Sequence, residues 1–164
     1  MNKCEKTRQK LRIGGDFMIK ISNNSIKKQK RKKILIACIG QCVHVAGSHN
    51  FMNVATKLGF ECVFLGPATP NSVIIEKLKN VKPNILGLSY RLTPSTLRPI
   101  LQQFKEKYEK LNQKPQQLFF AGTAEVVKVA KEFGMFHYYF IGGESKYKII
   151  SILREDLAAS EEKA

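Results

Sequence analysis

The segment ILIACIGQCVHVAG, residues 34–47, joins a strand-like run to a loop that carries a histidine. Ile34–Ile39 is short and aliphatic and is followed by Gly40, a pattern typical of a buried strand in a parallel sheet. In an open α/β sheet, the loop after the first strand lies at the carboxyl edge, where such folds bind ligands. Neutral imidazole is a good ligand for cobalt-type transition metals. The segment therefore predicts a metal ligand, His44, at the mouth of a crevice.

Apolar runs and helical patterns alternate along the rest of the chain. The predicted strands are Ile34–Ile39, Cys62–Leu65, Ile85–Ser89, Leu118–Ala121 and Tyr138–Ile141. The predicted helices are Phe51–Leu58, Ser72–Leu78, Pro94–Leu111, Glu125–Phe133 and Lys148–Leu157. Strict alternation indicates a parallel sheet with helices on both faces. We therefore predict an α/β fold of the flavodoxin-like (Rossmann-like) kind, with five parallel strands in the order 2-1-3-4-5.

Positive charge is concentrated before the first strand. The net charge is +15, and residues 1–33 account for +10 of it, with 12 Lys or Arg against 2 Asp or Glu. We predict a basic, disordered tail (1–32), a folded domain (33–157) and a frayed C-terminus (158–164). Such a tail is typically solvated, but it also suits phosphates or an acidic partner. The domain is not a basic nucleic-acid module, so any contact with nucleic acid would come from the tail.

Length and cysteine usage limit the class of protein further. No apolar run approaches the roughly 20 residues of a membrane span, and Lys and Arg recur throughout the N-terminal region, unlike a secretory signal. The four cysteines contain no CxxC pair. Cys38 and Cys62 lie in strand-like runs and are predicted to be buried thiols. We expect reduced thiols, no membrane association and a cytoplasmic protein.

Three short motifs, each in a loop at the same predicted sheet edge, carry a family resemblance. Cys42-x-His44-x-x-Gly47 is followed by 41 residues (48–88) and then by Ser89-Tyr90-Arg91. A further 29 residues (92–120) lead to Ala121-Gly122. This order and spacing resemble the cobalamin-binding domains of the mutase and methionine-synthase type, which carry Asp-x-His-x-x-Gly, Ser-x-Leu and Gly-Gly. The resemblance covers residues 33–157.

The resemblance implies a site for cobalamin, as adenosylcobalamin or methylcobalamin. In that family the nucleotide tail of the cofactor leaves cobalt and is buried between the sheet and a helix, and the histidine coordinates cobalt from below. This implies that His44 is the lower axial cobalt ligand. A serine hydroxyl such as that of Ser89 can bond a buried heterocycle, and glycine lets the backbone approach a ligand closely. The implied cofactor-binding residues are Gln41, Cys42, His44, Gly47, Ser89, Tyr90, Arg91, Leu92, Ala121, Gly122 and Thr123, and no catalytic residue is implied.

The chain departs from the family pattern at three positions. Cys42 stands where the family has Asp, Arg91 where it has Leu (with Leu92 one position late), and Ala121 where it has the first Gly. The family's Asp accepts a hydrogen bond from the ligating histidine, which fixes its tautomer and raises its basicity. A neutral thiol accepts such a bond only weakly. We therefore expect a weaker hold of His44 on cobalt, or orientation of His44 by another acceptor such as Gln41.

Several nearby residues also have structural interpretations. His49 and His137 are expected to be structural or exposed. Gly142-Gly143 is interpreted as a strand-to-helix turn rather than as part of a ligand site. Arg91 fits a contact with a corrin propionamide, a contact with an acidic partner or a solvent-facing cation equally well.

The resemblance implies a cobalamin-carrying subunit that serves a partner enzyme. Such a subunit would be similar to the small subunit of an adenosylcobalamin-dependent mutase, an isomerase whose larger barrel subunit binds the substrate. Because the cofactor supplies the chemistry, the isolated chain is expected to be inactive. A methyl-corrinoid carrier of a methyltransferase system and a cobalamin-responsive sensor are the alternatives. The sequence contains no GxGxxG motif, no P-loop and no nucleophile–base set that would indicate another enzyme.

Overall fold

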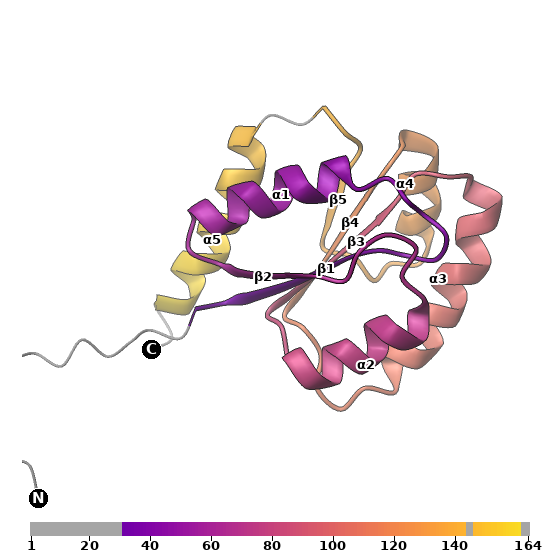
Figure 1. Cartoon of the computed structure of the whole chain (residues 1–164), viewed down its shortest axis with the longest axis horizontal. Helices are drawn as coiled ribbons and strands as arrows, with labels where there is room; N and C mark the ends of the chain where they lie inside the picture. Colours follow the sequence, from indigo (N-terminus) through magenta and orange to yellow (C-terminus); the bar gives the residue numbers. More distant parts are fainter. Residues whose placement is uncertain (1–30, 144–145, 162–164) are drawn as a thin grey trace, which may run out of the picture.

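The computed structural model describes residues 31–143 and 146–161, in which strands and helices alternate as predicted (Figure 1). The strands are β1 (Lys33–Cys38), β2 (Glu61–Phe64), β3 (Ile85–Tyr90), β4 (Gln117–Gly122) and β5 (Tyr138–Phe140). The helices are α1 (Ala46–Lys57), α2 (Asn71–Val81), α3 (Pro94–Glu109), α4 (Ala124–Glu132) and α5 (Lys146–Glu161). No helix within the described ranges is both long and apolar enough to cross a membrane.

The strands form one parallel sheet in the order β2-β1-β3-β4-β5. This confirms the predicted flavodoxin-like fold. Its register brings the predicted motifs into line at the carboxyl edge, because Ser89 pairs with Cys38 on one side and with Ala121 on the other. The chain reverses its direction of winding between β1 and β3, which is where open α/β sheets form a ligand crevice.

The helices cover both faces of the sheet, with α1 and α5 on one side and α2, α3 and α4 on the other (Figure 1). The larger core lies under α2, α3 and α4 and includes the fully buried side chains of Leu86, Leu97, Leu101, Phe104 and Phe120. A smaller core under α1 and α5 includes Ile34, Ala55, Ile85, Phe119 and Leu153. The two faces therefore differ in how much apolar surface they bury.

Local sequence explains where β1 ends and where α3 begins. Gly40 has φ +67°, a conformation that favours glycine, and a Cβ there would also push aside the Cδ1 end of the Ile100 side chain, 2.6 Å away. At the start of α3, the Thr93 hydroxyl accepts a hydrogen bond from the Thr96 amide at 3.4 Å, and Pro94 occupies the first helical turn. These two signals position the loops on either side of the crevice.

The limits of the folded domain differ slightly from the predicted ones. Lys32, assigned to the tail, donates a hydrogen bond at 2.5 Å to the Asp156 carboxylate, and the two side chains are 13% and 4% exposed. Helix α5 continues to Glu161, beyond the predicted boundary at residue 157. Residues 1–30 of the predicted tail lie outside the described residues.

Of the two thiols predicted to be buried, only one is. Cys38 is fully buried, whereas Cys62 is half-buried, so the prediction for Cys62 was wrong. The reason is topological, since Cys62 lies on β2, an edge strand that has a neighbour on one side only. Burial raises the pKa of the Cys62 thiol above its usual value, with a smaller opposing contribution from a hydrogen bond to Thr56.

Candidate functional site

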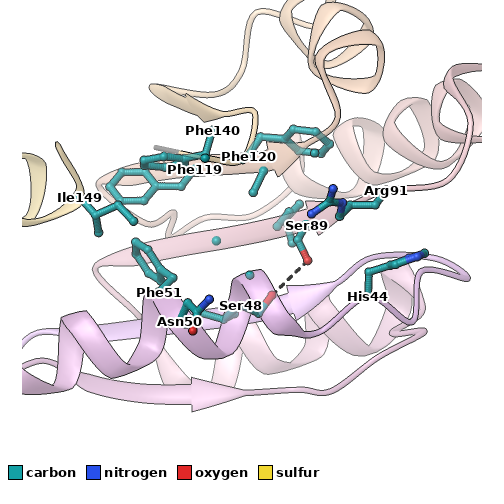
Figure 2. A pocket seen from close by; sticks show the side chains of 18 residues that line it. His44, Ser48, Asn50, Phe51, Ser89, Arg91, Phe119, Phe120, Phe140 and Ile149 are labelled. Atoms are coloured by element: carbon teal, nitrogen blue, oxygen red, sulfur yellow. Dashed lines mark hydrogen bonds between the residues drawn. The ribbon is translucent and has the colours of Figure 1, made fainter. Parts of the chain in front are cut away.

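A pocket of about 190 Å³ opens at the carboxyl edge of the sheet, on the face covered by α1 and α5 (Figure 2). It exceeds the roughly 150 Å³ of an engineered apolar cavity that binds benzene. Its walls come from β1, β3, β4, β5, α1, α5 and the loops after the strands. The lining residues are Ile36, His44, Gly47, Ser48, Asn50, Phe51, Gly87, Leu88, Ser89, Arg91, Phe119, Phe120, Ala121, Gly122, Phe140, Gly142, Gly143 and Ile149.

The two ends of this pocket differ in polarity (Figure 2). Ser48, Ser89, Arg91 and His44 lie toward one end, and the side chains of Phe51, Phe119, Phe140 and Ile149 lie toward the other. The three phenylalanine rings contact one another with centroid separations of 5.9–6.3 Å. The pocket is therefore a slot with an aromatic inner end and a polar mouth.

A chain of hydrogen bonds runs below the mouth of the slot. The Ser48 and Ser89 hydroxyls are 3.2 Å apart, the Ser89 hydroxyl donates to Sγ of Cys38 at 3.2 Å, and the Cys38 thiol donates to the carbonyl oxygen of His44 at 3.5 Å. All three side chains are buried. Buried polar groups need partners, and this chain supplies them. It also links the strand ends to the backbone of His44.

His44 is exposed at the mouth of the slot, and Cys42 is fully buried beside it. The Cys42 sulfur lies 3.8 Å from Nδ1 of His44, within reach of a weak sulfur hydrogen bond. The backbone of Cys42 is held by hydrogen bonds to Ile39 and Ala68. The loop therefore fixes the position of the thiol, while the imidazole beside it is exposed.

The structure brings six of the predicted site residues together around the slot: His44, Gly47, Ser89, Arg91, Ala121 and Gly122. The remaining five do not line it: Gln41, Cys42, Tyr90, Leu92 and Thr123. Successive residues of a strand face opposite sides of the sheet. Ser89 therefore faces the slot, whereas the side chain of Tyr90 lies in the core under α3, where its hydroxyl is hydrogen-bonded to that of Thr96 at 2.6 Å. Gln41 and Leu92 are exposed in loops, and Thr123 is the N-cap residue of α4.

Packing explains the glycine at position 122. A Cβ there would lie 2.6 Å from the carbonyl oxygen of Tyr90 and 2.8 Å from Cγ1 of Val126. Gly122 is therefore needed for the close approach of β3, β4 and α4, whether or not a ligand occupies the slot. At Gly47, by contrast, a Cβ would meet no atom within 4 Å.

Sequence analysis missed the inner end of the slot and part of its rim: Ile36, Ser48, Asn50, Phe51, Gly87, Leu88, Phe119, Phe120, Phe140 and Ile149. Gly142 and Gly143, interpreted as a plain turn, also line the slot, and both have positive φ angles of 90° and 72°. Strand register offers a signal that would have found some of them, because Ile36, Gly87 and Phe119 are neighbours in one row across the sheet.

The other two histidines are exposed, and one of them supports the sheet, which agrees with the prediction that both are structural or exposed. His49 is exposed on α1, with its ring 5.2 Å from that of Phe64. Nδ1 of His137 accepts a hydrogen bond from the Leu118 amide at 3.0 Å, so this residue supports the pairing of β4 and β5. No group of three or more His, Cys, Asp or Glu that could hold a metal ion occurs among the described residues.

The chain is similar in structure to several proteins of known structure. No family model matches the chain, and no curated protein matches it. A cobalamin-binding protein from Desulfitobacterium hafniense is similar at 27% identity and a TM-score of 0.60, over 76% of this chain and 59% of that one. A methanol:cobalamin methyltransferase complex from Methanosarcina barkeri is similar at 19% identity and a TM-score of 0.65, over 82% and 50%.

The fold is shared more widely. A response regulator receiver domain from Methylobacillus flagellatus is similar at 14% identity and a TM-score of 0.54, over 77% of this chain and 98% of that one. The chain thus spans about half to three fifths of the two cobalamin-related chains and nearly the whole of the receiver domain. Fold alone does not separate these groups, so the slot must carry the functional argument.

Proposed function

We propose that this chain binds cobalamin and carries it for a partner enzyme. The observation that carries the proposal is the slot between the sheet and the α1/α5 layer, which opens at the carboxyl edge beside the exposed imidazole of His44. A slot with an aromatic interior and a polar mouth suits a heterocyclic tail that is tethered to a larger polar group. The 27% identity with a cobalamin-binding protein supports the same ligand.

The residues of the slot fit such a cofactor. His44 would ligate cobalt through Nε2, because Nδ1 lies within 3.8 Å of the Cys42 sulfur. The Ser48–Ser89 pair would bond the heterocycle, and Gly87 lines the slot without a side chain that would fill it. When bound, the cofactor would supply the cobalt–carbon chemistry, and the chain's own residues would bind, orient and shield it.

Cys42 is the residue that sets this site apart from the family pattern. Its thiol replaces a carboxylate, lies 3.8 Å from Nδ1 of His44 and is fully buried. A thiol at this distance would orient the imidazole weakly and add no negative charge to raise its basicity. We therefore expect Cys42→Asp to tighten the binding of cobalamin through His44, with more of the histidine-bound form in the absorption spectrum. Unchanged affinity and spectrum would contradict this role for Cys42.

Two kinds of partner fit the proposal equally well. One is the substrate-binding barrel subunit of an adenosylcobalamin-dependent mutase, and the other is a methyltransferase served by a methyl-corrinoid carrier. Arg91 and the exposed side chains of Val43 and Leu92 stand in the loops around the slot, where either partner would approach the cofactor. Methyl transfer from the methylcobalamin-loaded chain to an acceptor thiol would favour the carrier, and turnover only with a barrel subunit and adenosylcobalamin would favour the mutase.

The decisive experiment is an absorption titration of the full chain with adenosylcobalamin and methylcobalamin. We expect saturable binding with the nucleotide tail displaced from cobalt and histidine in its place. His44→Ala should abolish the histidine-bound spectrum, whereas His49→Ala, an exposed histidine outside the slot, should leave it unchanged. Absence of binding by the wild-type chain would overturn the proposal. Binding that persists unchanged in His44→Ala would remove His44 as the ligand.

A further inference from the structure

We propose that the slot selects corrinoids by the chemistry of their lower base, accepting an apolar benzimidazole and rejecting a purine. This inference rests on the proposed function, since it concerns the ligand of the same slot. It assigns a specificity role to side chains outside the three motifs, chiefly Phe51, Phe119, Phe140 and Ile149. These side chains form the inner end of the slot and are referred to below as the aromatic wall.

The aromatic wall provides no side-chain hydrogen-bond partner. Phe119 and Phe140 are 2% and 8% exposed, and Phe51 packs edge-on against Phe119 at 6.0 Å between ring centroids. Ile149 closes the same end from α5 (Figure 2). The strands beneath have their backbone groups engaged in the sheet. A polar atom placed against this wall would lose its water and gain no hydrogen bond from the four side chains that form it.

The mouth of the slot, by contrast, has one hydroxyl proton to offer. Ser89 already donates to Cys38 at 3.2 Å, so its proton is in use. Ser48 lies 3.2 Å from Ser89 and can turn its proton to a ligand while the Ser89–Cys38 bond remains. A hydroxyl donor in this position matches a heterocycle that presents an acceptor nitrogen at the mouth. Asn50 also lines the slot, but it is an exposed residue on α1 and can satisfy its amide with water.

The connectivity of the ligand decides which of its atoms reach the aromatic wall. The five-membered ring of the lower base carries the link to the rest of the cofactor, which must remain outside the mouth. The six-membered ring therefore leads into the slot. In dimethylbenzimidazole this ring carries two methyl groups, which the aromatic wall accommodates. In adenine it carries an exocyclic amine and two ring nitrogens, which would be buried against the four wall side chains and receive no hydrogen bond from them.

The test compares three corrinoids by equilibrium dialysis against the full chain: cobalamin, its adenine-containing analogue and cobinamide, which lacks a lower base. A pocket of this kind discriminates against one added polar group by up to about 100-fold. We therefore expect the adenine analogue to bind roughly 10-fold to 100-fold more weakly than cobalamin. Cobinamide should also bind more weakly, because it leaves the slot empty.

A pair of variants ties this selectivity to the aromatic wall. Ile149→Gln places a hydrogen-bonding side chain at the inner end of the slot and should bring the affinities for cobalamin and the adenine analogue closer together. Ile150→Gln is the matched control, since Ile150 is similarly half-buried on α5 but does not line the slot. It should leave the ratio of affinities unchanged.

The outcomes separate this inference from the proposed function. If cobalamin and the adenine analogue bind with equal affinity, selectivity is refuted and the carrier function stands. Cobinamide binding as tightly as cobalamin would refute a role for the slot in holding the tail. If none of the three binds, the carrier function itself fails. If Ile150→Gln changes the ratio of the affinities for cobalamin and the adenine analogue as much as Ile149→Gln does, the aromatic wall is not the source of the selectivity.

Discussion

The two faces of the sheet are built from the same strands but are filled differently. Under α2, α3 and α4, side chains such as Leu97, Leu101 and Phe104 are fully buried and form a continuous core. Under α1 and α5 the core is smaller, and near the carboxyl edge it gives way to the slot. The comparison indicates that the face under α2, α3 and α4 contributes most of the buried apolar packing, whereas the other face leaves space for a ligand.

The six residues of strand β3 show this difference between a filled face and an open face. Leu86, Leu88 and Tyr90 fill the core under α2, α3 and α4. The alternate residues face the other side, where the large Ile85 lies in the core and the small Gly87 and Ser89 line the slot nearer the carboxyl edge. Because neighbouring side chains alternate between faces, one strand can pack tightly on one side and open on the other.

Truncating an aromatic ring on each face should give the largest contrast. Phe104→Ala removes a fully buried ring from the filled face and is expected to lower the free energy of unfolding by about 3–5 kcal/mol. Phe51→Ala, at the half-buried wall of the slot, should cost clearly less. Urea denaturation of both variants measures the difference. Equal losses would contradict the division between a filled and an open face.

Adding a methyl group to a glycine should give the next largest contrast. Gly122→Ala forces a Cβ against the Tyr90 carbonyl and Val126, and it should destabilise the domain by about 1–3 kcal/mol. Gly47→Ala lies in α1 with open space around it, so it should be neutral or stabilise the fold by about 0.4–1 kcal/mol. Thermal unfolding of the two variants provides the check, and a harmless Gly122→Ala would refute the packing argument.

Alkaline pH should affect the filled face through Tyr108, whose ring stacks on Phe104 with 5.6 Å between centroids. Burial raises the pKa of Tyr108 to about 12. Its unfolded value is about 10, so the stabilising contribution is complete below pH 10 and is lost as the pH rises through 12. The loss should reach about 1–2 kcal/mol and should be absent in Tyr108→Phe. Denaturation at pH 9 and pH 11.5 tests this, and identical pH profiles would exclude the role of Tyr108.

The smallest effect on stability is expected at the mouth of the slot. His44 is exposed, so His44→Ala should change the free energy of unfolding by no more than about 0.5 kcal/mol. The same variant should still lose the histidine-bound spectrum of cobalamin. Circular dichroism melts beside the absorption titration separate the two effects. A large drop in melting temperature would mean that His44 supports the fold as well.

Sequence periodicity was sufficient to predict the strand order, since each apolar run and each helical pattern occupies one element of the parallel sheet. It also predicted that Gly47, Ser89 and Ala121 meet at one edge, because loops after parallel strands share that edge. It failed for Tyr90, whose neighbour faces the slot while its own ring enters the core. It also failed for Cys62, because edge position depends on the whole sheet.

The aromatic wall was not predicted, for a physical reason. Phe51, Phe119, Phe140 and Ile149 come from four different elements, and each looks like an ordinary core residue in its own segment. Only the register of β3 and β4 and the placement of α1 and α5 over them show that these side chains surround a space. A vacancy depends on what neighbouring segments leave unfilled, which no single stretch of sequence encodes.

The ion pair between Lys32 and Asp156 fixes where the polypeptide enters the domain. β1 starts one residue later, at Lys33, so the entry point lies at the amino edge of the parallel sheet, opposite the edge that holds the slot. The first described residues and the imidazole of His44 therefore lie at opposite edges of the sheet, separated by the length of its strands.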